Sequence, residues 1–464
     1  MPVLLYMAML ACCIANFDIL RNLKDALLVT RLGAEVIPFI KFWAVFPSAF
    51  VFLGIYSFLA NRVSKRWLFI LVLLPFLIWM PVFSHFLYPR LDQLSPNSFL
   101  QPVLNLLPHH LQFVSGLFHY WPLTVFYIVA ELWGAAVICV LFWTTVNDAS
   151  CSGSAAYQYP RLIMVGNMAS LFSGPLVLFC VNKHQALGES GWQLSLETLS
   201  WIFTVLGVVF LMLFEVARWT QKDSSSADQP KESDSATSLP AIESLSYLLR
   251  SPHIVCIALI MLCYCITINL SEVIWKSQLA QFVSSQAEFS ILLGKMTFLY
   301  GVGTLIMGLI APYLLRRSWY AAALATPAVM AATILPFLLF TLWVGFQGEL
   351  NTSDGTLLGW VVGTGMLSLV LCKSAKYTWF DQTKEISFIP LSDEEKYKGK
   401  AAIELVVSRA GKSGSALFLQ SVIVFSGSIS MAIPMVALIL VIILGVWFFA
   451  LHRLNLRYML VASR

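Results

Sequence analysis

The chain has 464 residues, of which 59% are hydrophobic and only 11% are charged, with a formal net charge of +5. A soluble globular domain has about 25% charged residues, so this composition cannot cover a water-facing surface of such a long chain. The numbers exclude a soluble protein and predict an integral membrane protein. Repeated apolar runs of about 20 residues favour membrane-spanning helices over a barrel.

The apolar runs predict twelve membrane spans. In chain order they cover residues 2–30, 36–60, 67–88, 120–147, 161–182, 198–217, 252–274, 289–314, 318–345, 356–377, 402–427 and 430–451.

One polar segment interrupts this series between the sixth and seventh spans. Residues 220–244, TQKDSSSADQPKESDSATSLPAIES, are rich in Ser, Asp, Lys and Pro, a composition typical of a solvated linker. It predicts an N-terminal six-helix half (1–219), a cytoplasmic linker (220–247) and a C-terminal six-helix half (248–464). An all-α chain with a pseudo-symmetric 6+6 division is typical of transporters.

The distribution of basic residues predicts the orientation in the membrane. Most of the 29 Lys and Arg residues lie in the loops after even-numbered spans and at the C-terminus. The positive-inside rule therefore places both termini and the linker in the cytoplasm. The same bias explains the net charge without a nucleic-acid partner.

The nine cysteines show no metal-ligand spacing, so we predict neither a metal site nor a cofactor.

Four charged residues share the first predicted helix, in the run DILRNLKD. A charge in the middle of a bilayer costs about 2.5–3.5 kcal/mol on insertion scales, so each is a functional candidate. Asp18, Arg21 and Asp25 have the spacing i, i+3, i+7, and Arg21 is expected to be neutralised by both carboxylates. Lys24 has no acidic residue three or four positions away. Its ammonium suits an anionic substrate, against the alternative that it extends to the membrane interface.

Two further acids lie in apolar helices. Glu131, in AELWGAAV, is an isolated acid in the middle of the fourth span. Glu272, in INLSEVIWKSQ, ends the seventh span. For Glu272 a functional role and an ordinary helix pair with Lys276, four residues on, remain equally open.

The tenth span leads into the basic segment LCKSAKYTWFDQTKE. If its helix continues, Lys373, Lys376 and Lys384 fall within an arc of about 80° and form a face that can hold a polyanion. The alternative is an ordinary basic cytoplasmic loop, which we prefer for the later lysines of the segment.

The run VVSRAGKSGSA, residues 406–416, contains a Gly-Lys-Ser triplet that suggests a phosphate-binding loop. A Walker A loop needs glycine five residues before this triplet and follows a strand. Position 406 is Val406, and the preceding residues read as an apolar helix. We therefore predict no nucleotide-hydrolysing loop. Gly411 and Gly414 instead favour close helix packing or a helix break, and Lys412 is at best a secondary contact.

Several motifs together resemble a known family. The long run DQTKEISFIPLSDEEKYKGKAAIELVVSRAGKSGSA closely resembles the signature of the ATP/ADP translocase family of obligate intracellular bacteria and plastids. The resemblance extends over the whole chain through ILRNLKDALLVT, AEVIPFIKFWAVFPSA, ELWGAA, SGP, SYLLRSP and INLSEVIWKSQL.

This resemblance implies a major-facilitator-like bundle of about twelve helices that moves nucleotides by alternating access. It also implies that Lys24, Glu131, Glu272 and Lys384 take part in substrate binding or transport, on helices that line the central cavity of such proteins. The family's usual LRDxKD motif is LRNLKD here, with Asn22 in place of the acid. The segment after the fourth span also lacks much of the basic, glycine-bearing pattern of ATP/ADP exchangers.

The resulting function is exchange of ATP for ADP across the bacterial inner membrane by a multi-pass monomer. Lys24 and Lys384, with Lys376, are the predicted phosphate-binding cations, and Arg21 belongs to the same substrate-binding set. One alternative is proton-coupled net import of nucleoside triphosphates, with Glu131 as the proton carrier because isolation in an apolar helix favours a protonated carboxyl. Another is transport of a different organic anion. An enzyme is not expected, because no catalytic His/Asp cluster or Asp-rich metal motif occurs.

Overall fold

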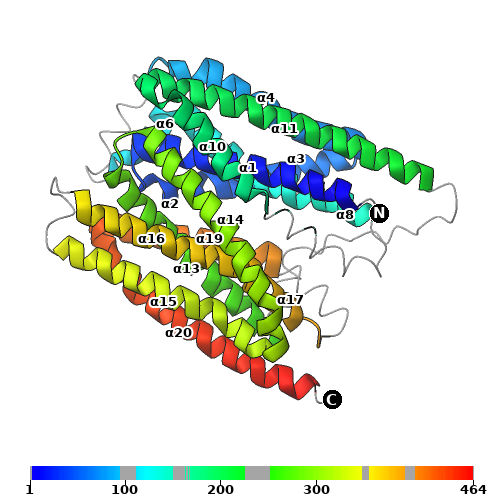
Figure 1. The fold of residues 1–464 in the computed structure, drawn as a ribbon, viewed down its shortest axis with the longest axis vertical. Coiled ribbons are helices and arrows are strands. Elements are labelled where there is room, and N and C mark those ends of the chain that lie inside the picture. Colours follow the sequence, from blue (N-terminus) through cyan, green and yellow to red (C-terminus); the bar gives the residue numbers. More distant parts are fainter. Residues whose placement is uncertain are drawn as a thin grey trace. The chain divides into compact units, whose positions relative to one another are not determined.

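The computed structural model describes residues 3–94, 111–149, 162, 166, 168–224, 251–346, 355–391 and 403–462. In these segments every regular element is a helix, as Figure 1 shows. The two compact units are Met1–Pro230 with Val283–Gly301, and Lys231–Phe282 with Val302–Arg464.

The first unit contains the helices of the N-terminal part of the chain. In chain order they are α1 (Val3–Leu32), α2 (Val36–Ile40), η1 (Lys41–Val45), α3 (Phe46–Ala60), α4 (Lys65–Val82), η2 (Phe83–Leu87), η3 (Tyr88–Arg90), α6 (Phe113–His119), α7 (Trp121–Trp133), η5 (Gly134–Phe142), α8 (Trp143–Ala149), α10 (Ser170–His184), η6 (Gln185–Leu187) and α11 (Gly188–Ser224).

The second unit contains most of the later helices. They are α13 (Pro252–Phe282), α15 (Trp319–Phe346), α16 (Gly355–Ala375), η8 (Lys376–Phe380), α17 (Asp381–Ser387), η9 (Ile403–Val407), α19 (Ser408–Ser426) and α20 (Ile429–Ala462). Helix α14 (Gln286–Arg317) is shared, because its residues up to Gly301 belong to the first unit and the rest to the second.

Within the described ranges, ten helical segments are long and apolar enough to cross a membrane. They are Val3–Leu32, Val36–Ala60, Lys65–Arg90, Trp121–Asn147, Ser190–Thr220, Pro252–Phe282, Gln286–Arg317, Trp319–Phe346, Thr356–Ser387 and Ile429–Arg457. These match ten of the twelve spans predicted from the sequence. The other two predicted spans fall on α10 and α19, so the count of twelve remains a prediction.

Two helices extend beyond the apolar runs that predicted them. Helix α13 reaches Phe282, eight residues past the expected end, and α16 continues through η8 and α17 to Ser387. Lys276 and Lys384 therefore lie on membrane helices rather than in loops. Apart from the last turns of α11, the predicted linker 220–247 lies outside the described residues.

Large apolar side chains remain exposed along these helices. Phe425 is 91% exposed, Phe346 85% and Leu309 83%. Exposed apolar side chains of this kind are expected on helices that are long and apolar enough to cross a membrane. Most buried positions are apolar, and the buried charged residues among the exceptions indicate the candidate site.

Candidate functional site

The first cluster of buried charges lies where α1 packs against α7. The Lys24 ammonium is 3.0 Å from Asp25 Oδ1 on its own helix and 2.9 Å from Glu131 Oε1 on α7. It also lies 4.2 Å from the centre of the Tyr127 ring, one helix turn before Glu131. The Lys24 side chain is 6% exposed and that of Glu131 29%, so the cluster reaches the surface of the unit through Glu131.

This geometry corrects two expectations from the sequence. Lys24 was expected to be an unneutralised ammonium, and Glu131 an isolated acid. The structure pairs these two residues with each other, and Lys24 also with Asp25. Helical spacing within α1 does not indicate the Lys24–Glu131 contact, because that contact forms only when α1 packs on α7. The reason for assigning Glu131 a proton-carrying role is therefore lost.

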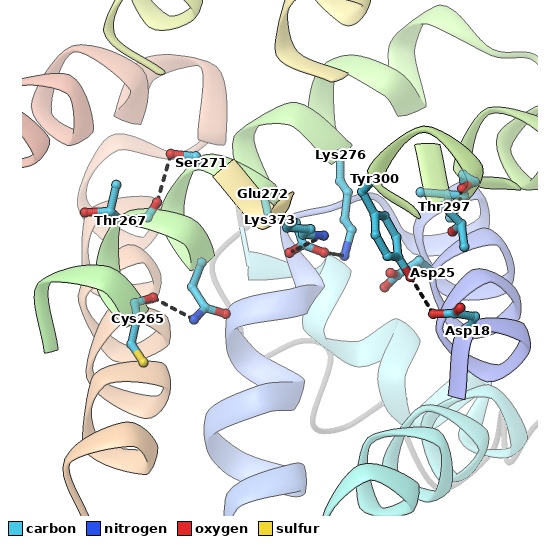
Figure 2. A network of polar contacts seen from close by, with 12 residues as sticks. Asp18, Asp25, Cys265, Thr267, Ser271, Glu272, Lys276, Thr297, Tyr300 and Lys373 are labelled. Atoms are coloured by element: carbon cyan, nitrogen blue, oxygen red, sulfur yellow. Dashed lines mark hydrogen bonds and ion pairs between the residues drawn. The ribbon is translucent and has the colours of Figure 1, made fainter. Parts of the chain in front are cut away.

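The two carboxylates assigned to Arg21 have other partners as well. Asp25 pairs with Lys24. Asp18 accepts hydrogen bonds from Ser170 (2.7 Å) and Ser173 (2.6 Å) of α10, and from Tyr300 (2.6 Å) of α14, as Figure 2 shows for Tyr300. Arg21 itself is half-buried on α1.

A second polar contact joins α1 to the first half of α14. The Asn22 amide donates to the backbone oxygen of Ser290 at 2.9 Å and accepts a hydrogen bond of 2.5 Å from the Ser290 hydroxyl. Both side chains are buried. Asn22 stands where the family motif has an acid, and an aspartate could not donate to the Ser290 carbonyl.

The second cluster of buried charges belongs to the other unit and joins α13 to α16. Lys276 Nζ is 2.8 Å from Glu272 Oε1, which confirms the helix pair considered from the spacing. Lys373 of α16 approaches the other carboxylate oxygen, with Nζ 3.3 Å from Oε2. Figure 2 shows the Glu272 carboxylate between the two ammonium groups. The side chains of Lys276 and Lys373 are 2% and 6% exposed.

The three lysines of the predicted cationic face have different carboxylate partners. Lys376 lies 3.0 Å from Asp381, and Lys384 lies 3.8 Å from Glu385, whereas Lys373 turns to Glu272. The π-helical segment η8 between Lys373 and Lys384 changes the angular spacing on which the arc was calculated. The Lys384 side chain is only 8% exposed.

The Gly-Lys-Ser triplet lies in the continuous helix α19, as predicted, and not in a loop. A Cβ atom on Gly411 would lie 2.7 Å from Cys265 Cβ, so this glycine permits close packing of α19 on α13. Gly414 has open space around its missing side chain, and the helix does not break there. Lys412 is exposed.

Sequence reasoning missed part of both clusters. Lys276 was treated as a neutralising neighbour and Lys373 as part of a different face. Tyr127, fully buried beneath Lys24, was not considered. The position of Tyr127 four residues before Glu131 places both on one face of α7, and that spacing was the available signal.

Known proteins match the chain over nearly its full length. The family model for the TLC ATP/ADP transporter matches residues 1–458. The chain is 36% identical to ADP,ATP carrier protein 1 of Chlamydia trachomatis, covering 96% of this chain and 87% of that protein. It is 35% identical to the chloroplastic ADP,ATP carrier protein 1 of Arabidopsis thaliana, over 96% and 72% of the two chains. With ADP,ATP carrier protein 3 of Rickettsia conorii it shares 30% identity, over 97% and 93%.

Solved structures of transporters share the fold. The nucleoside transporter NupG (D323A mutant) matches with a TM-score of 0.56 at 12% identity, covering 98% of each chain. A D-xylose-proton symporter matches with a TM-score of 0.53 at 12% identity, over 95% and 96%. At this identity the likeness concerns the fold alone, and it confirms the predicted fold class. The protein is a membrane transporter and not an enzyme, and the chain belongs to the TLC ATP/ADP transporter family.

Proposed function

We propose that this protein exchanges ATP for ADP across the inner membrane of a bacterium by alternating access. The names of the related carriers support the adenine nucleotides, and their full-length similarity supports exchange as the transport mode. The proposed substrate-binding residues are Lys24, Glu131, Glu272, Lys384, Lys376 and Arg21.

The observation that carries the proposal is the ion pair of Lys24 and Glu131 between two membrane helices. Charges inside membrane helices are costly and are retained for function, so a buried ammonium with two carboxylates needs a reason beyond packing. Nucleotide phosphates are anions that an ammonium binds as a point charge. We propose that phosphate oxygens of the nucleotide replace these carboxylates as partners of Lys24 when substrate binds.

The structure favours exchange over proton symport as the transport mode. Symport needs a carboxyl that gains and loses a proton in each cycle, and Glu131 was the candidate because of its isolation. Its oxygen lies 2.9 Å from the Lys24 ammonium instead. We retain Glu131 as a substrate-site residue and not as a proton carrier.

The membrane arrangement completes the proposal. We propose twelve spans, with α10 and α19 as the fifth and eleventh, in halves 1–219 and 248–464 joined by the linker 220–247. Both termini and the linker face the cytoplasm, in accord with the basic loops. The protein acts as a monomer.

Uptake of labelled ATP by cells that express the protein tests the function. We expect uptake that rises with internal ADP, that unlabelled ATP and ADP suppress, and that a protonophore leaves unchanged. Abolition by the protonophore would establish symport instead, and the absence of any nucleotide uptake would refute the function.

Two alanine variants test the site within the same assay. Lys24→Ala and Lys384→Ala should each lose uptake at wild-type expression levels in the membrane. Full uptake by either variant would remove that residue from the substrate site. Lys412→Ala is the matched control, because this exposed lysine of α19 lies outside the proposed set.

A further inference from the structure

Lys373 is a buried cation whose hydrogen-bonding capacity is unused. It lies near the C-terminal end of α16, directly before the π-helical segment η8, and its residue is 5% exposed. Its ammonium is 3.3 Å from Glu272 Oε2 but makes no hydrogen bond within the described part of the chain. π-helical segments are frequent at functional sites.

Glu272 is shared between two buried ammonium groups. Its Oε1 is 2.8 Å from Lys276 and its Oε2 faces Lys373 (Figure 2). One carboxylate carries a single negative charge, so it cannot fully neutralise both cations. The shorter ion pair with Glu272 is that of Lys276, and the longer one is that of Lys373. The three N–H donors of Lys373 make no hydrogen bond to the described residues.

A purely structural pair would not need Lys373. Glu272 and Lys276 already satisfy each other on one helix at i, i+4. A third charge with unmet donors destabilises a buried pair rather than strengthening it. The arrangement is suited to an anion that accepts hydrogen bonds from Lys373.

We propose that Lys373 and Lys276 form a binding site for the phosphate groups of the transported nucleotide, with Glu272 holding both lysines in the empty protein. The site deepens the proposed function and rests on it, and neither lysine belongs to the six residues given there. A phosphate has several anionic oxygens, so it accepts hydrogen bonds from both ammonium groups at once. Binding then frees the carboxylate from Lys373.

Nucleotide affinity of the purified full-length protein tests this site. Lys373→Met keeps the length of the side chain but removes its charge, and we expect about a 10- to 100-fold loss of affinity for ATP and ADP. Lys373→Arg keeps the charge and should retain most of the affinity. Lys295→Met is the matched control, because Lys295 is an exposed lysine of the membrane helix α14 and should show wild-type affinity.

Thermal unfolding of the empty protein separates binding from structure. The Lys373→Met variant loses buried N–H donors that make no hydrogen bond and keeps the closer Glu272–Lys276 pair, so its midpoint should equal or exceed that of the wild type while its affinity falls. Wild-type affinity in a folded Lys373→Met variant would overturn the site. If this variant does not fold, Lys373→Gln serves in the same comparison. Failure of the wild-type protein to bind ATP or ADP would refute the proposed function itself, a result distinct from the loss of this site.

Discussion

Lys24 forms ion pairs with two carboxylates, those of Asp25 and Glu131. The buried carboxylate of Asp25 depends on this ammonium more than the partly exposed carboxylate of Glu131 does. Asp25 is 1% exposed and Glu131 29%, so water can reach Glu131 but hardly reaches Asp25. Removing the shared ammonium therefore affects both acids, whereas removing Glu131 leaves the Lys24–Asp25 pair intact. The effects of single substitutions on stability should differ accordingly.

Substitutions at Lys24 and Glu131 should separate stability from transport. Lys24→Met is expected to destabilise the protein by about 3–5 kcal/mol, because both carboxylates lose their shared partner inside the unit. Glu131→Gln should lower stability by about 1 kcal/mol or less, because Asp25 still neutralises Lys24. Both variants should lose ATP uptake. Thermal unfolding in detergent and uptake at matched expression levels measure the two effects.

The double variant Lys24→Met/Glu131→Gln provides the control. In this double variant only one carboxylate, that of Asp25, has lost the ammonium. The thermal midpoint of the double variant should therefore lie above that of Lys24→Met alone. Equal midpoints for Lys24→Met and Glu131→Gln would contradict the asymmetry of this cluster.

At this scale the i, i+4 contact within α13 was predictable, whereas the Lys24–Asp25 pair within α1 and the contacts between helices were not. The spacing of Glu272 and Lys276 indicated their pair as one of two interpretations, and the structure confirms the contact. Lys24 and Glu131 are far apart in the sequence, and no pattern within either helix indicates which partner it packs against. The family resemblance and the charges in apolar helices predicted a functional role for both residues, but they did not predict the pairing.

At the scale of helices, the first half of α14 is held to α1 and α10 by buried polar contacts. Asp18 of α1 accepts hydrogen bonds from Ser173 of α10 and Tyr300 of α14. Asn22 of α1 makes two hydrogen bonds with Ser290 of α14, one to the backbone oxygen and one from the hydroxyl. Gly174, from the motif SGP, allows this packing, because a Cβ there would lie 2.7 Å from the backbone of both Gly294 and Phe298. The motif therefore has a structural reason, close approach of α10 and α14.

Asn22→Asp tests the contact between α1 and α14. A carboxylate at this position would face the Ser290 backbone oxygen, an acceptor now 2.9 Å from the amide nitrogen, so the variant should lose about 1–3 kcal/mol of stability. Ser290→Ala keeps the backbone oxygen and should lose only about 0.5–1.5 kcal/mol. Thermal midpoints of the two variants give the order. A more stable Asn22→Asp protein would show that the acid of the family motif fits this helix contact.

Two glycines of the Gly-Lys-Ser segment should respond in opposite directions. Gly411→Ala places a methyl group 2.7 Å from Cys265 Cβ, so overpacking between α19 and α13 should destabilise the protein by about 1–3 kcal/mol. Gly414→Ala enters open space and should stabilise the helix by up to about 1 kcal/mol. Thermal unfolding of both variants checks the sign, and a destabilising Gly414→Ala would contradict the packing described for this face.

Hydropathy predicted the existence of these helices but not their details. Apolar runs located ten membrane helices, because a spanning helix must be long and apolar. They did not show that α13 and α16 extend into charged sequence, or that α14 is divided between two units. The polar residues at helix ends lower the local hydropathy, although tertiary contacts keep the backbone helical.

Among the described residues, each of the two units contains a cluster of buried ion pairs. In the first, two carboxylates surround one lysine, and in the second, two lysines share one carboxylate. In the proposed function such groups accommodate a nucleotide that carries several negative charges and release it again. The charge that crosses the membrane in each cycle is therefore a property of the exchanged nucleotides, provided that no carboxyl group carries a proton with them.

Exchange of free ATP for free ADP should be electrogenic. ATP carries about four negative charges and ADP about three, so each inward ATP moves about one negative charge, worth roughly 2.3 kcal/mol per 100 mV. An inside-negative potential of 100 mV should therefore lower the equilibrium ratio of internal to external ATP by about fifty-fold. Proteoliposomes loaded with ADP, without Mg²⁺ and with a potassium diffusion potential set by valinomycin, measure this ratio. Exchange of labelled ADP for ADP is the control and should not respond to the potential, because no net charge moves. An ATP ratio that is also independent of the potential would mean that a proton accompanies ATP, and it would return a proton-carrying role to a carboxyl group of this chain.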